Sequence, residues 1–182
     1  MSDYTVQPKD KDELIEIIED TIKKEGRHCN LNFIDTSLIT DMSELFKDSK
    51  FNGNISEWNT SRVTDMTCMF AYSIFNGDIS NWDTSHVKNA PAMFFCSAFN
   101  KDISKWNTSN VENMGGMFYE SDFNGDISKW DVRKVLDMSF MFTGSKFCQD
   151  ISSWDMSGVL IIFEMFTGCP LEKKLEFKPK FN

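Results

Sequence analysis

The amino-acid sequence predicts an α/β solenoid, a right-handed coil of 24-residue repeats with one short strand and one short helix in each turn. Three observations carry this prediction. Aromatic and aliphatic residues recur every 24 positions through most of the 182-residue chain. No long insertion interrupts this period, which indicates stacked repeating units rather than a conventional globular core. A helical pattern precedes the first repeat and predicts a cap on the N-terminal end.

The repeat is defined by residues that keep one phase along the chain. The landmarks are Trp58, Trp82, Trp106, Trp130 and Trp154; Phe51, Phe75, Phe99, Phe123 and Phe147; Ile55, Ile79, Ile103, Ile127 and Ile151; and Val63, Val87, Val111, Val135 and Val159. An earlier copy begins at Leu31 and has Ile34 in the tryptophan slot. We therefore divide the chain into an N-terminal capping helix at 1–30, a six-coil solenoid at 31–170 and a C-terminal cap at 171–182.

The first half of each repeat predicts a short strand. Ile55, Trp58 and Thr60 follow the pattern I-x-x-W-x-T, and their slots accept aliphatic residues in other copies. These aliphatic replacements are Ile34, Val132 and Met156. Slots that exchange with aliphatic residues face a core, so we place the strand at about 58–60. Asn59 is then expected to point outward, because side chains alternate across a strand.

The second half of each repeat predicts one or two helical turns. In V-x-x-M-x-x-M-F the apolar residues fall at i, i+3, i+6 and i+7, which suits a short helix. An Asp or Asn, both preferred N-caps, stands just before the first methionine slot in five copies: Asp41, Asp65, Asn89, Asn113 and Asp137. Pro91 is compatible with a first helical turn. Gly115 and Gly116 weaken the helical pattern in one copy.

Both ends of the repeat array carry capping patterns. Asp10 and Glu13 have the spacing of a capping box, an apolar face follows, and Gly26 ends the segment. The C-terminal sequence LEKKLEFKPKFN is charged and is expected to close the last coil. Such caps are needed because the terminal unit of a stack otherwise presents an open edge.

The unit F-N-G-D-I-S-x-W-D/N-T-S-x-V, followed by M-F, resembles the BspA-like class of leucine-rich repeats, in particular its W-D-T-S type. The resemblance covers about residues 31–166. Cys169 stands where the other copies have serine, and this matches a cysteine common in related repeats. The resemblance implies a leucine-rich-repeat fold and an adhesion or protein-interaction role, often on a bacterial cell surface.

Composition excludes several partners. The formal net charge of −9 argues against binding to nucleic acid or to an anionic membrane surface. No apolar run approaches the ~18 residues that span a bilayer, and the N-terminal residues lack a signal-peptide pattern. The five cysteines include no C-x-x-C motif and favour free thiols in a reducing compartment. Localisation therefore stays open between a cell surface, implied by the resemblance, and the cytoplasm.

Two outward columns are the candidate contact surface. The first alternates Asp and Asn through most of its length: Asp35, Asn59, Asp83, Asn107, Asp131 and Asp155. We interpret it as a hydrogen-bonding ladder, with a polar ligand surface or a Ca²⁺ site as alternatives. The second column varies between copies: Glu57, Asn81, Lys105, Lys129 and Ser153. Lys105, Lys129 and Arg133 form a basic cluster, and we expect partners to dock there.

The function expected from the sequence is a monomeric, non-catalytic protein-interaction scaffold. The tryptophans are expected to form a core ladder, not an exposed strip. No cofactor or metal site is expected, and His86 and Cys96, which do not repeat, fall on different sides of the coil. A bacterial surface or adhesion-type recognition module is the first hypothesis. An intracellular inhibitor or immunity-type partner is the alternative, and a Ca²⁺-stabilised binding module is a third.

Overall fold

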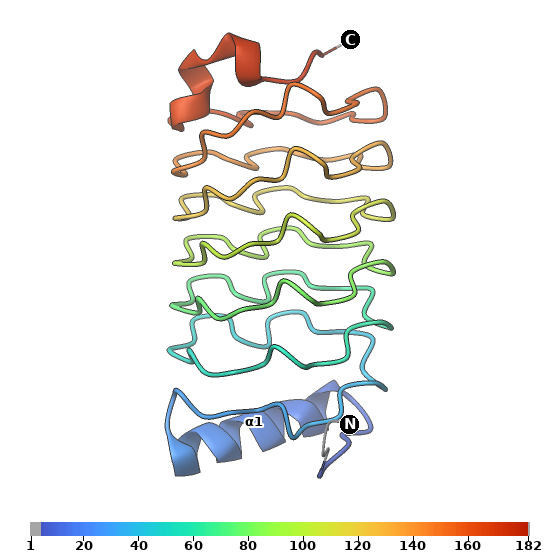
Figure 1. Cartoon of the computed structure of the whole chain (residues 1–182), viewed down its shortest axis with the longest axis vertical. Coiled ribbons are helices and arrows are strands. Elements are labelled where there is room, and N and C mark those ends of the chain that lie inside the picture. The colour runs from blue at the N-terminus through green and yellow to red at the C-terminus, as the bar shows by residue number, and fades with distance from the viewer. Residues whose placement is uncertain (1–4, 182) are drawn as a thin grey trace.

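The computed structural model describes residues 5–181, which form a stack of similar layers along one long axis (Figure 1). Helix α1 (Lys11–Glu25) lies at the N-terminal end, and the short 3₁₀ helices η1 (Pro170–Lys173) and η2 (Leu175–Phe177) lie at the other. We call each 24-residue turn of the stack a layer. Successive layers are joined by parallel bridges at Asp41–Asp65, Asp65–Asn89, Asn89–Asn113, Asn113–Asp137 and Asp137–Ile161. The chain is therefore a repeat protein.

The core consists of columns of identical side chains that run through the layers. The tryptophan rings stack at centroid distances of 6.4 Å in the pairs Trp58–Trp82 and Trp106–Trp130, and none of the five tryptophans is more than 6 % exposed. The indole N–H of Trp82 donates to the carbonyl oxygen of Ile55 in the preceding layer at 3.1 Å. The prediction that the tryptophans form a core ladder is confirmed.

Polar side chains turn the chain at up to four places in each layer. In one layer Asp126, Asp131, Asp137 and Ser145 each accept the backbone N–H two residues later, at 2.9, 3.2, 2.8 and 3.3 Å. Short polar side chains favour turns because they mimic a backbone acceptor in this way. The regular recurrence of Asp, Asn and Ser is therefore explained by the corners of the layers.

The prediction of a short helix in each repeat is wrong. Between Glu25 and Pro170 the described chain contains no helix. Cys68 and Tyr72 have φ values of 54° and 57°, which interrupt a right-handed helix. The same two positions have positive φ in six layers: Glu44, Cys68, Ala92, Gly116, Phe140 and Glu164; and Asp48, Tyr72, Cys96, Glu120, Gly144 and Gly168.

The physical reason is that hydrogen bonds between layers replace those of a helix. Every second N–H of this segment points to the next layer, so that Cys68 N–H donates to the Pro91 carbonyl oxygen at 3.0 Å and Phe70 N–H to that of Met93 at 2.9 Å. The intervening N–H groups close tight turns within the layer. The apolar spacing that suggested a helix is thus produced by consecutive turns.

The strand predicted at about 58–60 is also wrong, because none of the bridges involves these residues and the bridges that recur from layer to layer lie at the Asp65 column. The Trp58 N–H donates to the Ile55 carbonyl oxygen, which makes a turn. The buried hydroxyl of Thr60 donates to the Asp83 carbonyl oxygen of the next layer at 3.0 Å. A side chain therefore makes the contact between layers that a strand backbone was expected to make.

The two ends of the stack are closed differently. Asp10 caps α1 by accepting the Glu13 N–H at 3.0 Å, as the sequence predicts, and the helix buries Leu14 and Ile18 against the first layer. At the other end, Ile151 N–H donates to the Phe177 carbonyl oxygen at 3.0 Å. This cap is partial, because the last layer leaves four large apolar side chains exposed: Leu160 (77 %), Ile161 (49 %), Ile162 (39 %) and Phe163 (60 %).

Candidate binding surfaces

The Asp/Asn column predicted from the sequence forms the corners of the layers. The side chains of Asp35, Asn59, Asp83, Asn107, Asp131 and Asp155 accept the N–H two residues later. A hydrogen bond from Ser85 lowers the pKa of Asp83, and the guanidinium of Arg133 lowers the pKa of Asp131 to about 2. These bonds support the interpretation of the column as a structural ladder within the turns.

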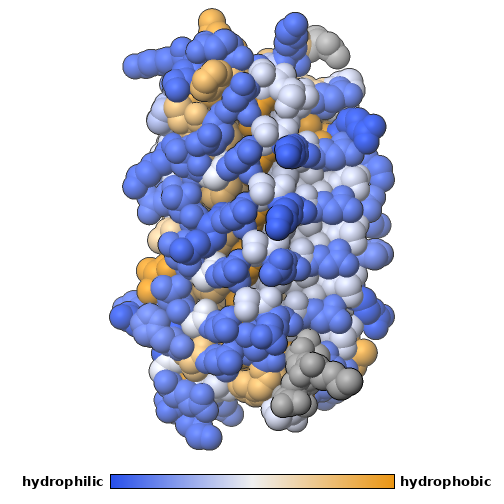
Figure 2. Space-filling model, in the orientation of Figure 1, coloured by the Kyte–Doolittle hydropathy of each residue, from blue (hydrophilic) through white to orange (hydrophobic). Residues whose placement is uncertain are grey.

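The variable column lies on the surface. Glu57, Asn81, Lys105, Lys129 and Ser153 are all exposed. Arg133 is not a free cation, because it bonds Asp131 through Nε at 2.9 Å and through Nη2 at 2.7 Å. Figure 2 shows that rows of hydrophilic side chains repeat from layer to layer on the visible face, with only small apolar areas between them. Docking at the basic cluster stays a prediction.

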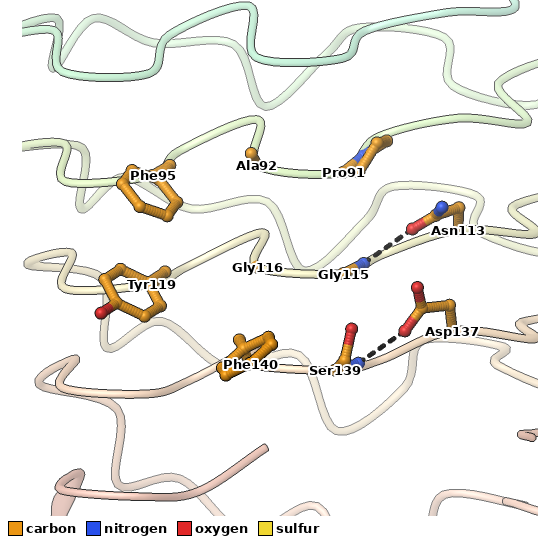
Figure 3. A pocket seen from close by; sticks show the side chains of 10 residues that line it. All are labelled: Pro91, Ala92, Phe95, Asn113, Gly115, Gly116, Tyr119, Asp137, Ser139 and Phe140. Atoms are coloured by element: carbon orange, nitrogen blue, oxygen red, sulfur yellow. Dashed lines mark hydrogen bonds between the residues drawn. The ribbon is translucent and has the colours of Figure 1, made fainter. Parts of the chain in front are cut away.

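A hollow of about 490 Å³ opens around Gly115 and Gly116, in the half of the repeat that was expected to be helical (Figure 3). It exists because one layer lacks two side chains. The next layer has Ser139 and Phe140 at the same two positions, and the preceding layer has Pro91 and Ala92. The hollow is therefore a local break in an otherwise regular surface.

Aromatic rings line one side of the Gly115–Gly116 hollow. Phe95 and Tyr119 stack in adjacent layers with centroids 4.5 Å apart and planes within 3°. Phe140 occupies the next layer below Gly116 in the view of Figure 3. All three rings are partly exposed. This side of the hollow offers apolar, polarisable contact area to a ligand.

Two oxygen atoms lie close together on the other side. Asn113 Oδ1 accepts the Gly115 N–H at 2.8 Å, and Asp137 Oδ1 accepts the Ser139 N–H at 2.8 Å. A Cβ atom on Gly115 would lie 3.3 Å from both Asn113 Oδ1 and Asp137 Oδ2. Even a Cβ atom would fit tightly there, so the glycine leaves the two acceptors from adjacent layers uncovered by a side chain.

The rim of the Gly115–Gly116 hollow is electronegative. The charge of Glu120 raises the pKa of Tyr119. Burial, followed by the charge of Glu120, raises the pKa of Cys96 to about 11, and the Cys96 Sγ atom lies 3.6 Å from Glu120 Oε2. The contribution of Glu120 to both shifts disfavours additional negative charge at this edge, whereas burial is the larger cause of the Cys96 shift.

Sequence reasoning did not identify this hollow, although one signal was present. Gly115 and Gly116 interrupt a segment in which the other copies carry side chains, and that interruption was interpreted only as a weakness of a helix. The aromatic residues Phe95, Tyr119 and Phe140 occupy positions that vary between copies. The stacking of layers brings them together with Asp137.

No arrangement typical of a metal centre occurs in residues 5–181, where no group of three or more His, Cys, Asp or Glu is placed to hold an ion. His86 lies within hydrogen-bond distance of Ser85, whereas Cys96 contacts Glu120. Within the same described range, no helix has both the length and the apolar character needed to cross a bilayer.

Comparison with known proteins identifies a family that the chain matches. The model of a family described as "Mycoplasma protein of unknown function, DUF285" matches residues 18–122 and 95–173, two overlapping stretches. No curated protein and no solved structure matches the chain. The two stretches together extend from 18 to 173 and cover most of the repeat stack. The chain therefore belongs to the DUF285 family.

Proposed function

We propose that the chain is a non-catalytic protein-binding scaffold that receives its partner at the Gly115–Gly116 hollow. The observation that carries this proposal is the break in the repeat: side chains are missing at two adjacent positions, and aromatic rings and a carboxylate border the space. Residues such as Ile79 and Trp82 are accounted for by packing, whereas the hollow has no evident role in stability. The hollow is open to solvent and combines apolar walls with a few polar groups, a kind of lining that is common in binding sites.

We further propose that the stack is a right-handed leucine-rich-repeat solenoid of the BspA-like type. The 24-residue period and the inward I-x-x-W-x-T pattern support this assignment. A role as a bacterial surface or adhesion-type recognition module rests on the same resemblance. The scaffold has no catalytic residues in this proposal, because the polar groups that repeat are used in the corners of the layers.

An intracellular interaction protein is the second candidate. It is favoured by the five cysteines, all of which are unpaired, with Cys29 and Cys169 buried. Free thiols of this kind are typical of a reducing compartment. Titration of thiols in freshly isolated native protein separates the two candidates. Five reduced thiols support the intracellular role, and oxidised cysteines support the surface role.

Affinity capture from the native host tests the scaffold, with both cell lysate and culture surface as sources. The wild-type chain is compared with Gly116→Phe, which fills the hollow with the residue that Phe140 supplies one layer later. Cys68→Phe is the matched control, because it introduces the same side chain at the same repeat position two layers earlier. We expect Gly116→Phe to lose the partner and Cys68→Phe to retain it.

A third variant reverses the charges of Lys105, Lys129 and Arg133 and tests the basic cluster predicted from the sequence. Loss of the partner in this variant alone places the contact on the basic cluster and contradicts docking at the hollow. Equal recovery of every protein by all four forms contradicts both surfaces.

A further inference from the structure

We propose that the Gly115–Gly116 hollow binds an arginine side chain from an exposed segment of the protein partner. The inference rests on the proposed function, because it names the chemical group that the scaffold recognises. Its structural basis is that Asn113 Oδ1 and Asp137 Oδ2 both face Gly115 at the wall of the hollow, each 3.3 Å from where a Cβ atom would lie, so that no side chain at this position covers them. Both atoms accept hydrogen bonds, so the matching ligand group must donate several.

The acceptor pair has capacity for a ligand. Asp137 uses Oδ1 for the Ser139 N–H, and Oδ2 has no hydrogen-bond partner among residues 5–181. Asn113 Oδ1 accepts one bond, from Gly115, and a carbonyl oxygen can accept two. Figure 3 shows the two side chains on the same side of the hollow, one above the other in adjacent layers. The planar guanidinium fork of arginine is suited to two acceptors placed in this way.

The aromatic side of the hollow fits the remainder of the side chain. Phe95, Tyr119 and Phe140 provide rings against which a guanidinium or its methylene stem can pack. The partly exposed surface keeps the charged end of the ligand near water, which lowers the cost of its desolvation. An anionic or purely apolar anchor would leave the Asp137 carboxylate without a compensating partner.

The arrangement is specific to one layer. In neighbouring layers, Pro91 and Ser139 occupy the position of Gly115 and carry side chains, and beside Ser139 the next layer has Ile161 in place of an acceptor. Ser43 holds the corresponding position beside Asp65 and also carries a side chain. The corner carboxylates therefore recur along the stack, whereas the open space beside them occurs at Gly115. This difference provides a matched control for the experiment.

The experiment is a titration of the full-length ¹⁵N-labelled chain, followed by NMR, with the capped peptide acetyl-Gly-Leu-Arg-Leu-Gly-amide. The same peptide with citrulline, the neutral isostere of arginine, is the ligand control. We expect the arginine peptide to shift the amide signals of Gly115 and Gly116. Citrulline is expected to weaken binding about tenfold, as is the variant Asp137→Asn, because each removes one charge from a charge-assisted hydrogen bond.

Asp137→Asn keeps the corner of its layer, since Asn89 and Asn113 occupy the same column in other layers. Asp65→Asn makes the same change beside Ser43 instead of a glycine and is expected to leave peptide affinity unchanged. Absence of shifts at Gly115 and Gly116, or equal affinity of wild type and Asp137→Asn, overturns the arginine site. Such a result leaves the scaffold standing if Gly116→Phe still loses the captured partner, so the two proposals fail separately.

Discussion

The rings of Phe118 and Phe123 lie face to face in one layer, with centroids 4.2 Å apart and planes within 13°. Phe118 also stacks on Phe94 at 5.6 Å and on Phe142 at 5.8 Å, in the layers on either side. The same contacts recur along the stack, so each internal phenylalanine is held both within its layer and between layers. Stacked aromatic columns of this kind provide much of the apolar burial in the protein.

Replacement of Phe118 by alanine is expected to lower the free energy of unfolding by about 3–5 kcal/mol, the usual cost of removing a fully buried phenylalanine. Phe166→Ala is the matched control in the same column. Phe166 belongs to the last layer and is 8 % exposed, so its loss leaves a site that water can partly fill. Urea unfolding followed by tryptophan fluorescence measures both variants. We expect Phe166→Ala to lower the free energy of unfolding less than Phe118→Ala. Equal destabilisation by the two variants would show that an internal position in the column adds no stability.

The last layer can be improved by restoring the polar corner that it lacks. Ile161 occupies the column of Asp137 and is 49 % exposed. Ile161→Asp places a carboxylate where it can accept the N–H of Phe163, as Asp137 accepts that of Ser139. We expect stability to rise by about 0.5–1.5 kcal/mol, the usual net contribution of one hydrogen bond. Thermal unfolding checks this, and a lower melting temperature would contradict the role assigned to the corners.

Acid is expected to destabilise the stack through its aspartates. The folded pKa of Asp131 is about 2, below the ordinary value of 3.8. The guanidinium of Arg133 and the backbone N–H of Arg133 both donate hydrogen bonds to the ionised carboxylate and so stabilise it. A lowered folded pKa means that the stabilisation is present above pH 3.8 and disappears as pH falls toward 2. Hydrogen bonds from the N–H two residues later lower the pKa of Asp78, Asp102 and Asp126 in the same direction.

The melting temperature should therefore fall between about pH 4 and pH 2, and Asp131→Asn should show a shallower fall than wild type. Asn107 and Asn59 occupy the same column, so the asparagine preserves the turn. A pH dependence identical in the two proteins would mean that the Asp131–Arg133 pair does not contribute to folding stability.

Cys96 is expected to react slowly with thiol reagents although it is partly exposed. Its pKa of about 11 leaves little thiolate at pH 8, and the thiolate is the reactive form. Glu120→Gln removes the charge that contributes to this shift and should increase the rate of alkylation by iodoacetamide. Glu112→Gln, a surface charge change in the same layer, is the control. Mass spectrometry of the peptide that contains Cys96 measures the rate, and an unchanged rate in Glu120→Gln contradicts the proposed influence of Glu120.

The period, the buried tryptophans and the N-terminal helix could be predicted from the sequence because they depend on residue types alone. Ile34 in the slot of Trp58 was sufficient to identify a core position. The conformation of the second half could not be predicted, because Cys68, Phe140 and Glu164 adopt positive φ without being glycine. Hydrogen bonds between layers stabilise that conformation, and they have no local sequence signature.

The candidate site was missed for a related reason. Asp137 and Gly115 are 22 positions apart and meet only because one layer lies on the next. The repeat pattern predicted a contact surface at positions that vary between copies, such as Lys105 and Lys129, whereas the hollow arises where side chains are missing. The space left by Gly115 and Gly116 can be recognised only when the side chains of the adjacent layers are in place around it.

Hydrogen–deuterium exchange of the chain, with and without its captured partner, tests the proposed contact most directly. If the partner docks at the Gly115–Gly116 hollow, exchange slows in peptides that contain 91–95, 113–119 and 137–140. Peptides confined to the exposed column at 81–85 and 105–109 should be unaffected. Slower exchange in that column, with unchanged exchange around Gly115 and Gly116, would contradict docking at the hollow and place the contact on the basic cluster.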